Sequence, residues 1–575
     1  MAKGFIDPKE LPCEFPRRFL PPDLPAGEWE EIAPFFEDLE KRKLDSQKDI
    51  EGALLDLSEL LSAVEEEGAI RYIRMTCDTA NPEYEKDYLK FVEEVAPKVE
   101  EALHRLRVKF ATSPAWKDLD EKRYLVLKRK WENAIAIFRE ENIPLKVEEE
   151  KLGQRYQKIF GAMTVEFEGR TQTLQQMAKY LEEPDRRIRE KAWELMAERR
   201  LKDREELESI FEELLSLRQK RAENAGFENF RDYAFRERER FDYGPKECEA
   251  FHKGVEEAVV PLLRHLHKER AKRLGLKKLR PWDLLCDPEG RPPLKPFREA
   301  KELVDGVQEI FLRLDQRLGE LFRRMAEFGL LDLANRPGKA PGGYQSTLTE
   351  RRLPFIFMNA VGRDQDLWTL LHESGHAFHT LLSRDEPLHM YRDPPLEFAE
   401  VASMGMELLA SPFLDVFYPE EADRRRSLEE HLYGIVRLLC WVATIDAFQH
   451  WIYTHPGHSR AERHKAWVEI FQRFSGLEDW SGYEEVLEHE WHRQLHLFLA
   501  PFYYIEYGIA QLGALRLWEK AQEDRKRAIE SYIQALKLGG GKPLPELFSA
   551  AELPFDFGPD SLSQAAKTIH RTLSR

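Results

Sequence analysis

Most of the sequence carries apolar residues at steps of three and four positions among dense charge. This spacing predicts helices that each pack one face against a core. The clearest stretches are Glu28–Leu61, Tyr84–Phe110 and Asp185–Glu223, the last preceded by Pro184 as a start signal. Because 42% of the residues are apolar, the chain can bury a large core. We therefore expect a mainly α-helical protein.

Strand signals are rare and local. Residues Met163–Leu174 predict a short hairpin around Glu168-Gly169, and Tyr344–Leu348 followed by Leu353–Asn359 predicts a second one. Proline lacks the N–H that a central strand needs on both sides, so Pro354 predicts that the later strand lies at a sheet edge. The small sheet would lie directly before the part of the chain that is richest in chemically active residues.

Charge and cysteine usage exclude several classes of protein. The 88 Lys and Arg against 105 Asp and Glu give a net charge of −17, which opposes general binding to nucleic acids. The cysteines show neither a disulfide framework nor the CxxC spacing of zinc sites, which favours a reducing, cytoplasmic environment. They are Cys13, Cys77, Cys248, Cys286 and Cys440.

The sequence also opposes membrane insertion and secretion. The most apolar window, Ile435–Phe448, is short and contains Arg437 and Asp446. At the N-terminus, Asp7 and Pro8 stand where a signal peptide has an apolar run. We expect a soluble cytoplasmic protein without a membrane or nucleic-acid partner. The sequence does not predict its oligomeric state.

The motif His372-Glu373-Ser374-Gly375-His376 carries the most specific chemistry. Residues four apart on a helix lie about 400° around it, so His372 and His376 would stack one turn apart and could share one zinc ion. Glu373 would point elsewhere and could reach a water molecule on that ion. We expect Asp366 to cap this helix. A glycine inside a helix costs about 1 kcal/mol relative to alanine, so Gly375 indicates close packing there.

A catalytic zinc ion needs a third protein ligand. His379 lies about 10 Å along the helix from His372, too far for both to bind one ion, and we expect it to be solvated or hydrogen-bonded at the rim of the site. A later helix beginning at Pro395 offers Glu400 and Glu407 on one face. One of them could bind zinc while the other accepts the N–H of a ligand histidine, and Glu397 is a rival ligand.

Several motifs together resemble the oligoendopeptidase F branch of the thimet oligopeptidase family of zinc metallopeptidases. The resemblance covers residues 160–550 and lies in these segments: Pro341–Tyr344, Pro354–Asn359, His372–His379, Phe398–Ser403, and more weakly Leu279–Leu284, Pro501–Tyr507 and Leu538–Gly540. It implies a two-lobed helical molecule with a deep channel, a small sheet beside the HExxH helix, and one zinc ion per chain. Such a channel would admit only short unstructured peptides.

The resemblance also implies roles for individual residues. His372, His376 and Glu400 would bind zinc, and Glu373 would be the general base. His496 and Tyr507 would stabilise the transition state, with Tyr504 as a second candidate donor, because Phe498 and Ile505 stand where the branch tends to have tyrosine. The domains would be 1–195, helical with a short hairpin, and 196–575, the catalytic zinc metallopeptidase domain.

We predict that the chain hydrolyses internal bonds of oligopeptides, with the strand Pro354–Asn359 pairing with the peptide backbone. One alternative is a zinc carboxypeptidase or dipeptidyl carboxypeptidase in which Arg351, Arg352 or Arg493 holds the substrate carboxylate. A second is a catalytically inactive peptide-binding protein on the same scaffold. His489, His492 and His496 also lie at helical spacing, and we interpret them as a partly exposed helix face rather than a second metal site.

Overall fold

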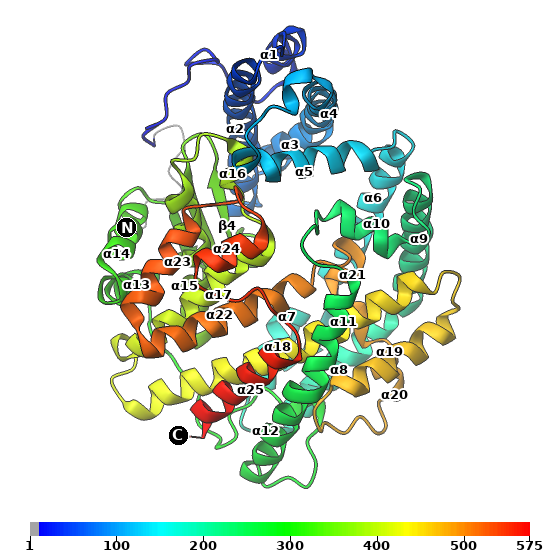
Figure 1. Ribbon diagram of the computed structural model, residues 1–575. Coiled ribbons are helices and arrows are strands. Elements are labelled where there is room, and N and C mark those ends of the chain that lie inside the picture. The colour runs from blue at the N-terminus through cyan, green and yellow to red at the C-terminus, as the bar shows by residue number, and fades with distance from the viewer. Residues whose placement is uncertain (1–10, 575) are drawn as a thin grey trace. The chain divides into compact units, whose positions relative to one another are not determined.

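The computed structural model describes residues 11–574 and is mostly helical, as predicted (Figure 1). These residues form two compact units, each built from separated stretches of the chain. The first comprises 11–136, 294–428 and 513–555, and the second comprises 137–293, 429–512 and 556–574. The boundary predicted near residue 195 falls inside a helix of the second unit and stays a prediction.

The first unit contains a helical layer, a three-stranded sheet and the helices packed on that sheet. Its elements are α1 (Trp29–Lys41), α2 (Gln47–Cys77), α3 (Pro82–Lys90), η2 (Phe91–Val95), α4 (Ala96–Thr112), η3 (Pro114–Trp116), α5 (Glu121–Ile137), α13 (Ala300–Leu314), α14 (Gln316–Glu327), β3 (Leu331–Ala334), β4 (Tyr344–Leu348), β5 (Leu353–Ala360), α15 (Asp364–Ser383), α16 (His389–Arg392), α17 (Leu396–Ala410), η7 (Ser411–Val416), α23 (Arg525–Leu536) and α24 (Leu544–Ala550).

The second unit is helical except for one hairpin. Its elements are α6 (Asn142–Gly161), β1 (Thr164–Phe167), β2 (Arg170–Thr173), α7 (Leu174–Met177), η4 (Ala178–Glu182), α8 (Arg186–Lys202), α9 (Arg204–Asn224), α10 (Phe230–Glu237), α11 (Pro245–Gly254), η5 (Val255–Val259), α12 (Val260–Arg273), η6 (Pro281–Asp283), α19 (Arg460–Phe474), α20 (Glu484–Glu488), η8 (Glu490–Arg493), α21 (Leu495–Leu499) and α25 (Pro559–Leu573). Three helices contribute residues to both units: α18 (Glu421–Thr454), α22 (Ile505–Glu523) and, with its last residue Ile137, α5.

Two of the predicted helical stretches are divided in the structure. The stretch Glu28–Leu61 is broken between α1 and α2 because Ser46 caps a new helix, its hydroxyl accepting the N–H of Asp49. The stretch Asp185–Glu223 is broken at Asp203, while Asp185 caps α8 as its start signal predicted. The apolar spacing continues across both breaks, so periodicity alone does not mark them.

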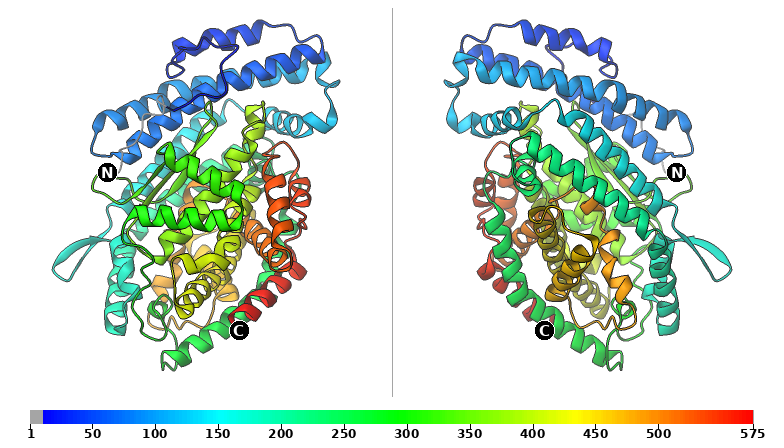
Figure 2. Two further views of the ribbon diagram at one scale, coloured as in Figure 1. Left: turned by 90° about the vertical axis from the view of Figure 1, so that its left-hand side faces the viewer. Right: turned by 90° about the vertical axis from the view of Figure 1, so that its right-hand side faces the viewer.

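The first predicted hairpin is confirmed as β1 and β2, which pair from Thr164 with Thr173 to Phe167 with Arg170. Its turn residues, Glu168 and Gly169, both have positive φ, as a two-residue hairpin turn of type I′ requires. In Figure 2 the hairpin stands out from the neighbouring helices.

The second predicted hairpin, β4 and β5, is also confirmed, but the edge position predicted for its later strand is wrong. The strand order is β3-β5-β4, so β5 is central. Pairing of β5 with β3 begins at Ile356, two residues after Pro354, which therefore takes no position in that ladder. On the other side Pro354 is paired with Thr347. The proline is tolerated because only one of its two sides faces a strand.

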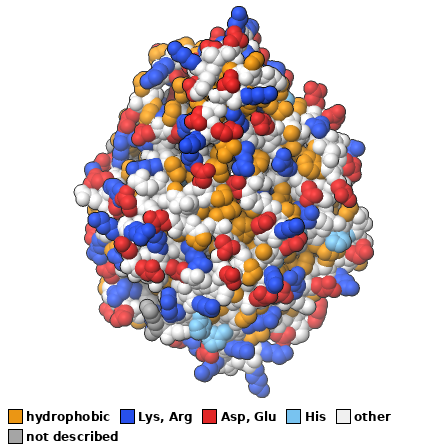
Figure 3. Space-filling view, viewed as in Figure 1, with side chains coloured by type: hydrophobic (Ala, Val, Ile, Leu, Met, Phe, Trp, Pro, Cys, Tyr) orange, Lys and Arg blue, Asp and Glu red, His pale blue; other side chains and the backbone are white. Residues whose placement is uncertain are grey.

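Among the described residues, α18 is the one helix long and apolar enough to cross a membrane by length and composition. Of its most apolar window, 67% is buried inside the protein, and Asp446 within it has no exposed surface. This burial is typical of a core helix. On the face drawn in Figure 3, Lys and Arg side chains are interspersed with Asp and Glu.

The most extensive helix packing of the first unit is between α15 and α17, and α15 also packs against β4 and β5 (Figure 1). A Cβ atom on Gly375 of α15 would lie 2.4 Å from the carbonyl oxygen of Ala402 and 2.5 Å from the Cα of Ser403, both on α17. The hydroxyl of Tyr532 donates to the same Ala402 carbonyl at 2.8 Å, which holds that backbone in place. The close packing that was predicted from the position of Gly375 inside a helix is therefore confirmed.

We predict that Gly375→Ala lowers the free energy of unfolding by about 1–3 kcal/mol, although alanine is the better helix former, because neither backbone can yield to the new methyl group. Thermal or urea unfolding of the full chain measures this change. Gly52→Ala on α2 is the matched control, since nothing lies within 4 Å of its Cβ position, and it should leave stability unchanged or raised. Equal stability of Gly375→Ala and the unaltered chain would contradict the packing argument.

Candidate metal centre

Helix α15 carries three of the predicted site residues, and its start is fixed by two acids. The Asp366 carboxylate accepts the backbone N–H of Val361 at 2.8 Å and of Arg363 at 2.9 Å. Asp366 thus caps the helix as expected, but from its first turn, because the helix begins at Asp364. The carboxylate of Asp364 accepts the hydroxyls of Tyr418 and Ser427, each at 2.6 Å. These bonds anchor the segment that positions the imidazoles.

The side chains of His372, His376 and Glu400 converge where α15 faces α17. Glu400 Oε2 lies 3.4 Å from Nε2 of His372 and 3.7 Å from Nε2 of His376. One ligand atom from each of the three residues lies within 4.8 Å of the other two. Two imidazole nitrogens and one carboxylate oxygen form a ligand set that zinc accepts, and three protein ligands leave a coordination position for water or substrate. The residues present therefore fit a catalytic zinc ion.

Two further side chains orient these ligands. Glu407 Oε1 lies 2.6 Å from Nδ1 of His372, so the other ring nitrogen, Nε2, faces His376 and Glu400. The Ser403 hydroxyl donates to Glu400 Oε2 at 2.9 Å. Glu400 and Glu407 thus share one face of α17. Glu397 on the same helix is buried but does not belong to the converging set.

The electrostatics of the site favour a cation. Burial alone would lower the pKa of His372, but hydrogen bonds and charge from Glu400 and Glu407 outweigh it and raise this pKa well above its ordinary value. Burial lowers the pKa of His376 to about 4, which keeps that imidazole neutral. Burial would raise the pKa of Glu400, but His372, His376 and Ser403 lower it to about 2. An ionised Glu400 beside a neutral His376 is the protonation state that binds a metal.

Glu373 has a different environment from Glu400. It is buried, and this burial raises the pKa of its carboxyl to about 7, with the charge of His372 opposing the rise and that of Glu400 adding to it. The backbone of Gln345 on β4 also opposes the rise of this pKa, so the sheet contributes to the environment of the acid.

The environment of His379 differs from the one that we predicted from the sequence. It is 3% exposed, and neither of its ring nitrogens has a hydrogen-bond partner among the described residues. Burial lowers its pKa to about 3, so it is neutral. The prediction of a solvated or hydrogen-bonded histidine at the rim is wrong, because the aromatic ring of Phe398 on α17 covers it.

The remaining predicted residues form an aromatic cluster in the second unit. The ring of His496 on α21 lies 4.8 Å from that of Tyr504 and 6.0 Å from that of Tyr507 on α22, between ring centres. Tyr503 stacks on His496 at 5.4 Å. Burial lowers the pKa of His496 to about 4 and raises that of Tyr504 to about 12, so Tyr504 keeps its donor proton at neutral pH. Tyr504 lines a cavity of about 520 Å³ with Trp441, among others.

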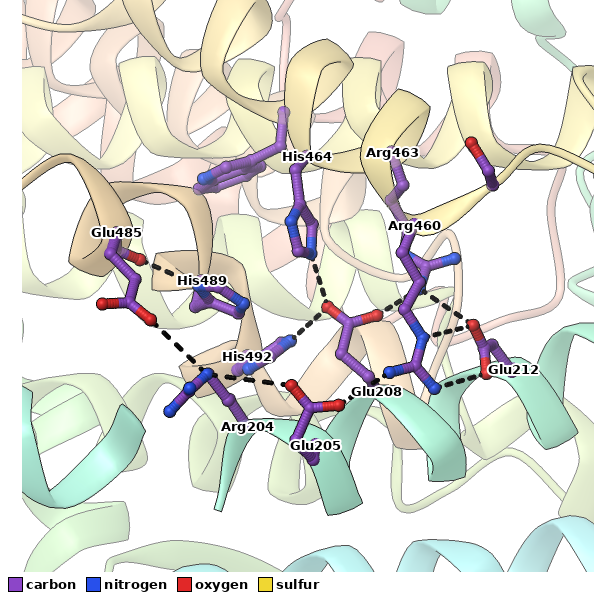
Figure 4. A network of polar contacts seen from close by, with 12 residues as sticks. Arg204, Glu205, Glu208, Glu212, Arg460, Arg463, His464, Glu485, His489 and His492 are labelled. Carbon is purple, nitrogen blue, oxygen red and sulfur yellow. Dashed lines mark hydrogen bonds and ion pairs between the residues drawn. The ribbon is translucent and has the colours of Figure 1, made fainter. Parts of the chain in front are cut away.

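Of the three histidines at helical spacing, His489 and His496 are partly exposed, as expected, whereas His492 is buried. His489 and His492 lie in the network of polar contacts in Figure 4. His492 is 3% exposed, and its Nε2 lies 2.9 Å from Glu208 Oε1 on α9. His464 Nε2 lies 2.7 Å from the same oxygen, while Arg463 contacts the other oxygen of Glu208. The cationic partner that Glu208 needs is therefore already present. The sequence analysis missed this network because Glu208 is more than 250 residues from His464 in the chain.

Two models of known protein families match the chain. The model of peptidase family M3 matches residues 179–557, and the model of the peptidase M3 N-terminal domain matches residues 24–138. Oligopeptidase PepF of Bacillus subtilis is 24% identical over 322 residues, which cover 55% of this chain and 46% of that protein. The chain thus spans about half the length of the curated relatives that it matches.

Solved structures match over nearly the whole chain. PZ peptidase A, solved with an inhibitor, has a TM-score of 0.88 and 28% identity, covering 98% of this chain and 99% of that one. An X-ray structure assigned to an oligoendopeptidase F has a TM-score of 0.87 and 30% identity, covering 97% of this chain and 98% of that one. Because the family model matches more than half of its length, the chain belongs to peptidase family M3, and oligoendopeptidase F proteins are among its homologues.

Proposed function

We propose that this protein is a zinc-dependent oligoendopeptidase that hydrolyses internal bonds of short, unstructured peptides. The observation that carries the proposal is the convergence of His372, His376 and Glu400 within 4.8 Å, next in sequence to the buried Glu373. Membership of peptidase family M3 supports the reaction class. The five free cysteines support a reducing, cytoplasmic location.

Glu373 is proposed to act as the general base and then as the general acid. A zinc ion held by His372, His376 and Glu400 would supply a Lewis acid and lower the pKa of a water molecule toward about 7. Glu373 accepts a proton from the attacking water and delivers it to the nitrogen of the departing amine. A pKa of about 7 suits both steps, because the carboxyl can then take up and release a proton near neutral pH.

The sheet order changes the proposed route of the substrate. Since β5 has a neighbouring strand on each side, it cannot pair with a peptide as predicted for Pro354–Asn359. Strand β4 is an edge strand of this sheet, and an extended peptide can add to its outer side. Because the backbone of Gln345 on β4 acts on the pKa of Glu373, we expect a peptide there to pass beside the base. Backbone pairing reads no side chains, so we expect broad sequence tolerance.

We further propose that Tyr507, with Tyr504 or His496, donates hydrogen bonds to the oxyanion that forms from the scissile carbonyl. The protonated state of Tyr504 and the clustering of all three rings support this role. The arginines considered for a carboxypeptidase are engaged elsewhere. Arg351 contacts Glu66, Arg352 donates to the carbonyl of Arg384 at 2.6 Å, and Arg493 lies 2.5 Å from Glu490.

Cleavage of a peptide that is blocked at both ends tests the reaction class. The variant Glu373→Gln, assayed with the same peptide, tests the role of Glu373. We expect mass spectrometry to show internal cleavage that a chelator abolishes and zinc restores, and Glu373→Gln to keep its zinc while kcat falls at least about 100-fold. Cleavage only of peptides with a free C-terminus would indicate a carboxypeptidase. Binding without cleavage would indicate an inactive peptide-binding protein, and full activity of Glu373→Gln would refute its role as base.

Variants of two acids on α17 test which of them is the third metal ligand. We predict that Glu400→Ala loses one zinc ion per chain, because it removes a carboxylate from the converging set, whereas Glu397→Ala keeps it. Metal analysis of both purified variants after dialysis measures the ratio. The reverse result would transfer the ligand role to Glu397.

Tyr507→Phe removes one hydroxyl and leaves the ring in place. We predict that kcat falls about 100-fold while KM changes little, because a donor to the developing oxyanion acts mainly in the transition state. Tyr503→Phe is the matched control from the same cluster and should leave kcat within a few-fold. A larger loss for Tyr503→Phe than for Tyr507→Phe would exchange their roles.

A further inference from the structure

Four side chains with metal-binding chemistry meet inside the second unit, apart from the residues of α15 and α17. Cys248 and His252 lie four residues apart on α11, and Asp446 and His450 lie four residues apart on α18. Each pair therefore projects from one face of its own helix. The two pairs come from parts of the chain that are 194 residues apart, measured from His252 to Asp446.

The distances bring Cys248, Asp446 and His450 to one point, and His252 lies against the aspartate of that set. One ligand atom each of Cys248, Asp446 and His450 lies within 4.8 Å of the other two, so a single point can lie within about 2.8 Å of all three. Nε2 of His252 lies 2.8 Å from Asp446 Oδ2, and Nε2 of His450 lies 3.3 Å from the same oxygen. A modest inward movement of the side chains reaches zinc–ligand distances, which are about 2.0–2.3 Å.

The group is buried, and some of its polar atoms are unsatisfied. Cys248 and Asp446 have no exposed surface, His252 is 6% exposed and His450 is 8% exposed. Asp446 Oδ1 and His450 Nδ1 have no hydrogen-bond partner among the described residues. A buried polar atom without a partner costs about 1–3 kcal/mol of stability. A bound ligand that contacted these atoms would remove that cost.

The surroundings are aromatic, and two arginines whose charges act on the group, Arg240 and Arg473, each pair with an acid outside it; for Arg473 this is Glu256 at 2.8 Å. The rings of Phe235 and Phe502 pack against His450, and that of Phe474 packs against His252. The nearby Arg240 forms an ion pair at 3.0 Å with Glu506, so its charge is already balanced.

We propose that Cys248, His252, Asp446 and His450 form a closed, structural zinc site. Cysteine, histidine and aspartate are all zinc ligands, and four protein ligands complete a tetrahedral shell with no open position. One zinc ion with a thiolate, a carboxylate and two neutral imidazoles has no net charge, which a fully buried group requires. Binding releases the thiol proton of Cys248 to solvent, so one proton leaves for each ion bound. The site would tie α11 to α18.

Metal content tests this site in a chain that lacks the other one. We expect the double variant His372→Ala/His376→Ala to retain about one zinc per chain after dialysis, independently of the proposed function. Adding Cys248→Ser or His450→Ala should reduce this to below about one tenth. Adding Cys440→Ser should not, since Cys440 is a buried cysteine of α18 outside the group. A double variant that folds but holds no zinc would overturn the proposal.

Cobalt replacing zinc in the otherwise unaltered chain gives a test that needs no substitution. A thiolate ligand produces a sulfur-to-cobalt charge-transfer band in the near ultraviolet, which the two imidazoles and carboxylate of the other site cannot produce. We expect this band at one cobalt ion per chain, with an intensity unchanged in His372→Ala/His376→Ala. Absence of the band from a chain loaded with two cobalt ions would exclude Cys248 as a ligand and overturn the proposal, whether or not the Cys248 variants fold.

Discussion

The contact between Gly375 of α15 and the backbone of α17 is the constraint on which the candidate active site depends. Without a side chain at Gly375, the two helices approach until a Cβ atom would lie 2.4 Å from the Ala402 carbonyl. That approach brings Glu400 to within 4 Å of both imidazoles and Glu407 to His372. The short spacing between the helices therefore converts a two-histidine motif into a three-ligand site. The glycine is part of the site although it binds nothing itself.

Burial gives neighbouring carboxylates of the site opposite properties. Glu400 is held ionised because imidazoles and the Ser403 hydroxyl surround it, whereas Glu373 has fewer such partners and its pKa rises to about 7. The first property suits a metal ligand and the second suits a group that exchanges protons. The same principle separates the two histidine networks of the second unit. Glu208 has Arg463 beside it, whereas Asp446 lies against histidines and a thiol.

Local signals in the sequence predicted local structure well. The hairpins around Glu168-Gly169 and between β4 and β5, the cap at Asp185 and the helical character of most of the chain follow from short-range chemistry. The central place of β5 does not, because it depends on β3, which lies more than 20 residues earlier and carries no strong strand signal of its own. The environment of His379 was also mispredicted, since Phe398, which covers it, belongs to another helix.

The sequence by itself determined the helix that carries His372, Glu373 and His376 and the helix that carries Glu400 and Glu407, because helical spacing fixes which side chains share a face. Only the tertiary structure decided that Glu400, and not Glu397, belongs to the converging set, and that burial raises the pKa of Glu373. It also decided that Cys248 and His252 meet Asp446 and His450. Contacts between distant segments depend on how whole helices pack, and that packing is set by the shape of many side chains together.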